Sequence, residues 1–278
     1  MSKKFERVQQ CYEVVRKRTD FKPVLGVVLG SGLGNYANQM EVIDEIPYCE
    51  IPGFPVSTVE GHDGRFLFGY IGKVPTVLMK GRVHYYEGYT MEDVVLPIRL
   101  MKLLGIETLL LTNAAGGINP TFKVGDFMVI TDQISSFVPS PLIGENVSEM
   151  GDRFTDMTQI YDLELQGLLK AAAKERNIDV KEGIYVQASG PNFESPAEIK
   201  MFAALGIDAV GMSTTCEALV ARHAGVRVAG VSCISNLASG ISEVELSHDD
   251  VQSIANERGG ELEQFITAYI TKLGEITL

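Results

Sequence analysis

Short apolar runs alternate with helix-like segments along most of the chain, and this alternation constrains the fold more than any other feature. The predicted strands lie at residues 23–30, 106–117, 126–134, 183–190, 208–213 and 226–236, with a hairpin over 65–80. The predicted helices lie at 91–105, 161–177, 195–206, 214–225 and 247–271. Such alternation predicts an α/β fold in which helices flank a mixed central β-sheet.

The chain contains no linker, repeat or low-complexity tract, so residues 1–278 are predicted to form a single domain. The longest predicted connection is residues 136–154, rich in Pro, Gly and Asn, and connections of that length are usually functional or mobile. The first 18 residues are typical of an amphipathic helix and lack the apolar core of a signal peptide. No apolar run is long enough to span a bilayer, and we expect a cytoplasmic protein that binds no membrane.

The charge and the cysteines exclude several classes of protein. The net charge is -12 and the pI is about 4.9, so nucleic acid would be repelled, and any anion site must be built locally from a few cations and backbone N–H groups. The four cysteines form no C-x-x-C pair, and the sequence therefore predicts neither a zinc site nor a redox site.

The stretch "GRVHYYEG" at residues 81–88 is the most distinctive local feature. It follows a predicted strand, and strand alternation would place Arg82, His84 and Tyr86 on one face. An Arg and a His side by side suit a phosphate, because charge-assisted hydrogen bonds are about twice as strong as neutral ones. The alternative is an Arg–carboxylate ion pair beside a hydrogen-bonded histidine.

Two glycine-flanked segments carry weaker signals. The run Gly30-Ser31-Gly32-Leu33-Gly34 follows a predicted strand and could offer N–H groups and a hydroxyl to an anion. The alternative is a tight turn that needs the conformational freedom of glycine. His62, in "EGHDG", would by itself be interpreted as a surface or capping histidine.

Further predicted strands end in small or polar residues. Tiny residues at 114–117 would let a ligand approach the backbone. Phe193 and Glu194 could stack on a flat base and accept its N–H groups, although a glutamate near a helix start is also a common cap. Met212-Ser213 and Ser235-Asn236 end two more strands. Together these residues predict a ligand with a phosphate, an apolar middle and a planar polar end.

Seven motifs in this order resemble the trimeric purine nucleoside phosphorylases of the phosphorylase superfamily. They are "GSGLG", "EGHDGR", "GRVHYYEGY", "TNAAGGINP", "GPNFES", "AVGMST" and "ISN". The resemblance implies the phosphorylase-superfamily fold and a glycosyltransferase (pentosyltransferase) of purine salvage. Such an enzyme would cleave 6-oxopurine (deoxy)ribonucleosides such as inosine and guanosine reversibly, giving the free base and (deoxy)ribose 1-phosphate. The resemblance further implies phosphate as co-substrate, no cofactor, no metal and a homotrimer.

The resemblance also implies a role for each matching residue. Phosphate would be held by Ser31, His62, Arg82, His84, the backbone N–H of Ala114, and Ser213. The ribose would contact Tyr86, Met212 and His248, and Phe154 would reach it from a neighbouring subunit. The base would be bound by Ala115, Gly116, Phe193, Glu194 and Asn236. The catalytic residues would be His84, Glu194 and Asn236, with Asn236 stabilising N7 of the departing purine.

Three alternatives remain, and the sequence departs from the family in small ways. A methylthioadenosine or adenosine phosphorylase would use aspartate where this chain has Asn236, and would need no polar partner such as His248 for the 5′ position. A non-catalytic nucleoside-binding module would be expected to lose the phosphate-binding residues. A nicotinamide dehydrogenase is disfavoured because this sequence lacks the rest of the dinucleotide-binding fingerprint.

The departures from the family pattern are small. Ser235 replaces a common threonine, residues 237–239 lack a lysine found in some members, and Thr215-Cys216 replaces Val-Pro.

Overall fold

The structure, a computed structural model, describes residues 2–58, 64–242 and 245–277. Its strands are β1 Leu25–Leu29, β2 Glu41–Pro47, β3 Arg65–Ile71, β4 Val74–Lys80, β5 Thr108–Gly117, β6 Phe127–Ile134, β7 Val180–Gln187, β8 Ala209–Gly211 and β9 Arg227–Leu237. Its α-helices are α1 Lys3–Arg16, α2 Met91–Leu104, α3 Leu163–Glu175, α4 Pro196–Ala204, α5 Thr215–His223 and α6 His248–Thr277.

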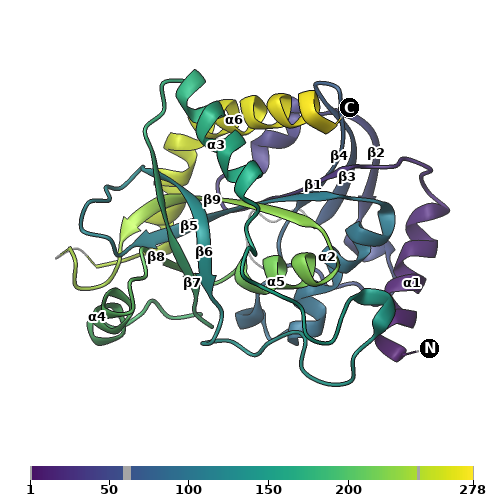
Figure 1. The fold of residues 1–278 in the computed structure, drawn as a ribbon, viewed down its shortest axis with the longest axis horizontal. Coiled ribbons are helices and arrows are strands. Elements are labelled where there is room, and N and C mark those ends of the chain that lie inside the picture. Colours follow the sequence, from purple (N-terminus) through teal and green to yellow (C-terminus); the bar gives the residue numbers. More distant parts are fainter. Residues whose placement is uncertain (1, 59–63, 243–244, 278) are drawn as a thin grey trace.

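Helices cover both faces of one mixed sheet, as Figure 1 shows. Helices α1, α2 and α5 lie on one face, and α3 and α6 lie on the other. Val95 of α2 and Val220 of α5 belong to one buried apolar cluster, whereas Leu169 of α3 and Phe265 of α6 belong to a second. Each helix thus buries an apolar stripe against the sheet. The predicted single-domain α/β fold with a mixed central sheet is confirmed.

The strand order brings several carboxyl ends to one edge of the sheet. The order is β2-β3-β4-β1-β5-β8-β7-β6-β9, and β9 also pairs with β5, so the last five strands close into a circuit. Strands β4, β1, β5 and β9 run parallel to their neighbours in this group. In sheets of this kind ligands bind beyond the carboxyl ends of the strands.

The segment after β4 differs from its prediction. The strand ends at Lys80, and Gly81 has a φ of 111°, a left-handed conformation that glycine adopts easily and that turns the chain out of the sheet. Residues Tyr85–Glu87 then form a short 3₁₀ helix. The prediction that strand alternation aligns Arg82, His84 and Tyr86 is therefore wrong, although all three side chains reach the same pocket by this other route.

The small residues at the end of strand β5 remain part of the sheet. The strand was predicted over residues 106–117, and it spans Thr108–Gly117. Its last two residues pair with β8 on one side and with β9 on the other, and these hydrogen-bonded neighbours hold the glycines extended.

In the part of the chain that the structure describes, no helix combines the length and apolar character needed to cross a membrane.

Candidate active site

A pocket with a volume of about 340 Å³ lies at this edge of the sheet. It is lined by Gly30, Ser31, Arg82, His84, Tyr86, Asn113, Ala114, Ala115, Gly116, Pro191, Phe193, Glu194, Val210, Gly211, Met212, Ser213, Ser235, Asn236, His248 and Val251. Every predicted site residue is in this set except His62 and Phe154. His62 lies outside the described residues, and Phe154, 90% exposed, lies on the long loop before α3.

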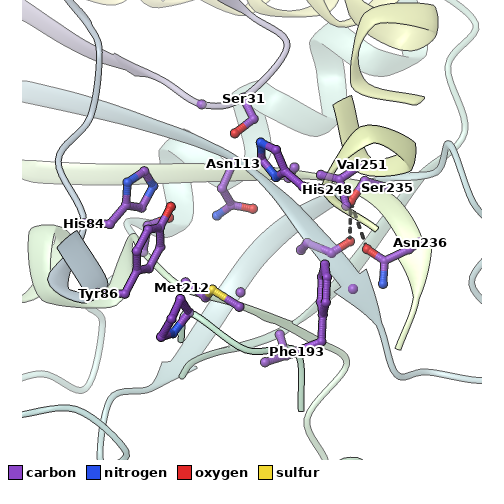
Figure 2. Close-up of a pocket in the computed structure, with 18 of the residues that line it drawn as sticks. Ser31, His84, Tyr86, Asn113, Phe193, Met212, Ser235, Asn236, His248 and Val251 are labelled. Atoms are coloured by element: carbon purple, nitrogen blue, oxygen red, sulfur yellow. Dashed lines mark hydrogen bonds between the residues drawn. The ribbon is translucent and has the colours of Figure 1, made fainter. Parts of the chain in front are cut away.

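Figure 2 shows how several of these side chains lie across the pocket. His84 and Tyr86 lie on one side and Phe193 and Asn236 on the other, with Met212 between them. The structure thus brings residues from β5, β8, β9, α6 and four connecting segments together in one pocket.

Arg82 is buried and held by two partners. Its side chain is 2% exposed, Nε donates to Oε1 of Glu217 at 3.0 Å, and Nη1 donates to the carbonyl of Thr112 at 2.8 Å. The sequence left open whether Arg82 faces an anion or a carboxylate. The structure shows the carboxylate partner, Glu217, and it also places Arg82 in the wall of the pocket.

His84 is oriented by a carboxylate and a neighbouring ring. Its Nδ1 lies 3.0 Å from Oε1 of Glu87, and its ring stacks on Tyr86 with centroids 4.8 Å apart. Burial and the nearby charge of Glu87 raise the pKa of Tyr86 to about 12, so its phenol stays neutral near pH 7. The result is a fixed imidazole beside a neutral hydroxyl.

The glycine segment is a tight turn and a pocket wall at the same time. Gly32 has a φ of 81°, and a Cβ there would lie 2.4 Å from Cβ of Ala255 in α6. A side chain at this position would therefore push the turn away from α6. The neighbouring Ser31 lines the pocket, so the two interpretations of this segment are compatible.

Glu194, the neighbour of Phe193 in the sequence, lines the pocket and is 9% exposed. Its burial, together with the negative charge of Glu198, raises the pKa of this carboxyl group above its ordinary value.

The amide of Asn236 packs against Gly116. A Cβ at Gly116 would lie 3.1 Å from Nδ2 of Asn236, so the absence of a side chain at Gly116 leaves room for the amide. A carboxylate and an amide in one pocket can accept from and donate to the edge of a planar base.

A β-bulge sets the position of Asn236. Ala115 pairs with Ile234 and Gly116 pairs with Asn236, which leaves Ser235 as the extra residue of β9. The hydroxyl of Ser235 lies 3.1 Å from Oδ1 of Asn236 and 3.4 Å from the carbonyl of Ala115, the two dashed lines in Figure 2. The bulge therefore turns Asn236 into the pocket and Ser235 holds its amide.

Sequence reasoning missed the residues that support the pocket. Glu87 and Glu217 hold His84 and Arg82, and Asn113 donates to the hydroxyl of Thr214 at 2.9 Å. The spacing Thr214-x-x-Glu217 is the sequence signature of a helix capping box and could have identified Glu217. Among the described residues, no three His, Cys, Asp or Glu side chains are grouped so that they could hold a metal ion.

Comparisons with known proteins agree with this geometry. The family model of the phosphorylase superfamily matches residues 24–271. Purine nucleoside phosphorylase 1 of Geobacillus stearothermophilus is 45% identical over 268 residues, which cover 96% of this chain and 98% of that protein.

Solved structures of Schistosoma mansoni purine nucleoside phosphorylase have the same fold. The complex with adenosine is 37% identical with a TM-score of 0.91, covering 96% of this chain and 97% of that one. The complex with inosine is 37% identical with a TM-score of 0.89, covering 96% of both chains. The family match over most of the chain, with relatives at these identities, shows that the chain belongs to the phosphorylase superfamily.

Proposed function

We propose that this enzyme is a purine nucleoside phosphorylase that cleaves 6-oxopurine nucleosides with inorganic phosphate in purine salvage. The observation that carries the proposal is the separation of two kinds of groups in one pocket. Figure 2 shows the imidazole of His84 and the phenol of Tyr86 on one side of the pocket and the ring of Phe193 and the amide of Asn236 on the other, and Arg82 and Glu194 also line the pocket. Such a pocket suits a nucleoside whose sugar lies between a phosphate and a purine.

Phosphate is assigned to the end that holds Arg82 and His84. Ser31, Ser213 and the backbone N–H of Ala114 supply further donors, and His62 completes the set implied by the family resemblance. The position of Arg82 is fixed by Glu217 and the carbonyl of Thr112. A preorganised donor set of this kind favours an anion without further reorganisation.

The sugar is assigned to Tyr86, Met212 and His248. The purine is assigned to Phe193 for stacking, to the backbone at Ala115 and Gly116, and to Glu194 and Asn236 for its polar edge. As a carboxylate, Glu194 accepts a hydrogen bond from N1–H of a 6-oxopurine, whereas adenine has no hydrogen at N1. This difference favours inosine and guanosine over adenosine.

The reaction then needs no covalent enzyme intermediate. The bond between C1′ and N9 breaks while a phosphate oxygen forms a bond to C1′ from the opposite face, which gives ribose 1-phosphate. The purine departs with the bonding electrons and takes up a proton, and Asn236 stabilises N7 as it gains that proton. Phosphate stabilises the positive charge on the sugar, so catalysis rests on positioning and electrostatics.

A trimer is part of the proposal because of Phe154. Its ring is 90% exposed, so burial in its own chain does not explain this aromatic residue. In a closed trimer, the phenyl group of Phe154 could cover the sugar site of a neighbouring subunit, as the family resemblance implies.

One assay tests the proposal. Purified enzyme is incubated with inosine, adenosine or methylthioadenosine, with and without phosphate, and the free base is measured. We expect phosphate-dependent release of hypoxanthine to be the fastest reaction. Arg82→Ala should raise the KM for phosphate and lower kcat, because the anion is also the nucleophile. Release that does not depend on phosphate, or a preference for methylthioadenosine, would contradict the proposal.

A further inference from the structure

One buried carboxylate joins two segments of the pocket that are far apart in the sequence. Oε1 of Glu217 accepts from Nε of Arg82 at 3.0 Å, and Oε2 accepts from the backbone N–H of Thr214 at 3.0 Å. The Glu217 and Arg82 side chains are 1% and 2% exposed. Glu217 does not line the pocket, yet it contacts one pocket residue and the neighbour of another.

Thr214 has an unusual backbone conformation. Its φ is 84° and its ψ is -52°, whereas a β-branched residue rarely adopts a positive φ. The N–H of Thr215 donates to the carbonyl of Ser213 at 3.1 Å, which closes a three-residue γ-turn centred on Thr214. Such a conformation persists only where the surrounding structure enforces it.

Three contacts enforce this turn. Glu217 accepts the N–H of Thr214, Asn113 donates to the Thr214 hydroxyl at 2.9 Å, and the Ser213 hydroxyl lies 3.0 Å from the same oxygen. Ser213 is the pocket residue next to the turn. The conformation of Thr214 therefore determines where the Ser213 hydroxyl lies.

The guanidinium of Arg82 is fixed by the same carboxylate. With Nε bound to Glu217 and Nη1 bound to the carbonyl of Thr112, both the plane and the rotation of the guanidinium are set. Arg82 comes from the segment after β4, and Ser213 comes from the segment before α5. Without the shared carboxylate, these two segments could adjust their side chains independently.

We infer that Glu217 is the positioning residue of the anion site, holding Arg82 and Ser213 in one arrangement that fits a tetrahedral oxyanion. The inference rests on the proposed function for the identity of that anion as phosphate. If Glu217 only balanced the charge of Arg82 and capped α5, its substitution would lower the stability of the protein without selectively raising the KM for phosphate.

Glu217→Gln separates these two roles. The amide has nearly the same shape, but it has one acceptor oxygen, so either Nε of Arg82 or N–H of Thr214 must face an NH₂ group. We expect the KM for phosphate to rise about tenfold or more, while the KM for inosine changes less than about twofold. Phosphate should also raise the Tm of this variant much less than that of the wild type, a readout that needs no turnover.

Asp93→Asn is a matched control. Asp93 caps α2 by accepting the N–H of Thr90 at 3.0 Å, and its other oxygen pairs with Arg7 at 2.7 Å, outside the pocket. This variant should lose stability but keep the wild-type KM for phosphate. An equal rise in phosphate KM in both variants would overturn the inference, because the effect would then follow from general destabilisation.

Glu217→Asp carries the test if the glutamine variant does not fold. It keeps the charge but is one methylene shorter, so it cannot reach both partners, and a raised phosphate KM is again expected. Wild-type phosphate kinetics in a folded Glu217 variant would overturn the inference. A wild-type enzyme that is stabilised by phosphate but does not cleave inosine would instead overturn the proposed function.

Discussion

The Nδ1 atom of His84 and the backbone N–H of the same residue both face one oxygen of Glu87, at 3.0 Å and 2.7 Å. The other carboxylate oxygen accepts from the N–H and the hydroxyl of Thr58, at 2.6 Å and 2.8 Å. Glu87 thus holds the imidazole and joins it to the segment before residue 59. Since Nδ1 faces Glu87, Nε2 is the ring nitrogen that an anion in the pocket would meet.

The first prediction concerns the acid stability that Glu87 provides. Partial burial alone would raise its pKa, but the hydrogen bonds from His84 and Thr58 outweigh burial and lower the pKa to about 2 from an ordinary value of 4.5. A lowered carboxyl pKa stabilises the folded state above the ordinary value, and this contribution is lost as the pH falls through the lowered one. Glu87→Gln should therefore be less stable than the wild type at pH 7.

The difference in free energy of unfolding should stay constant from pH 7 to about pH 5 and shrink below about pH 4.5. Urea unfolding of both proteins across this range measures it, with Glu182→Gln, at an exposed carboxylate outside the pocket, as the control. A difference that is as large at pH 3 as at pH 7 would contradict the role given to Glu87.

The second prediction concerns the pH dependence of base binding. Burial, followed by the charge of Glu198, raises the pKa of Glu194, so this carboxyl group takes up a proton at a higher pH than an ordinary glutamate. A protonated Glu194 accepts poorly from N1–H, and kcat/KM for inosine should fall as the pH drops through that raised pKa. Glu198→Gln removes the neighbouring charge and should move this fall to lower pH.

The glutamine in Glu198→Gln can still cap α4, so the fold should be kept. The measurement is kcat/KM for inosine against pH in the wild type and in this variant. The control is Glu182→Gln, which should leave the profile in place. A shift to higher pH, or no shift, would show that Glu198 does not act on Glu194.

The third prediction concerns Phe154. We expect sedimentation at assay concentrations to show a trimer, and Phe154→Ala to raise the KM for inosine about tenfold, because an aromatic cover over the sugar would be lost. Ile143→Ala is the control, since Ile143 is a 71% exposed apolar residue on the same loop. A fully active monomer, or an equal effect of both substitutions, would reject the assigned role of Phe154.

Local patterns predicted most of the fold. The strand at residues 23–30, the hairpin over 65–80 and the helix over 195–206 lie within one or two residues of β1, β3 with β4, and α4, because apolar periodicity, Gly72 and the Ser-Pro cap act over a few residues. The edge strand β2 was missed because its first five residues are largely exposed and show no apolar alternation.

The candidate site could be predicted only in part. The predicted site residues came from an ordered set of motifs, whereas Glu217 lies 135 residues from Arg82 and no local pattern indicates that pairing. The bulge at Ser235 depends on how β9 aligns with β5, which is a property of the folded sheet. The route of residues 81–87 depends on Gly81 and on Glu87, and strand alternation could not account for either.

The last prediction concerns how Asn236 distinguishes 6-oxopurines from 6-aminopurines. Its Oδ1 lies 3.1 Å from the Ser235 hydroxyl and its Nδ2 donates to the carbonyl of Leu237 at 3.2 Å, so the amide is held by one partner at each end. Aspartate has nearly the same size but only accepts when ionised. It should repel a 6-oxo group and attract a 6-amino group.

Asn236→Asp should therefore lower kcat/KM for inosine and raise it for adenosine, each on the order of tenfold to a hundredfold, since a buried mispaired polar group costs about 1–3 kcal/mol. The gain with adenosine should be the smaller change. Glu194 still favours a base with a hydrogen at N1, and the new carboxylate also faces the carbonyl of Leu237 in place of a donor.

Asn236→Ala provides the matched control, because it removes the same hydrogen bonds without adding a charge. It should lower kcat/KM for both nucleosides and give no gain with adenosine. Steady-state kinetics on inosine and adenosine for the three proteins decide the question. If the ratio of the two kcat/KM values is the same in Asn236→Asp as in the wild type, Asn236 does not read position 6 of the purine, and the preference for 6-oxopurines must come from Glu194 alone.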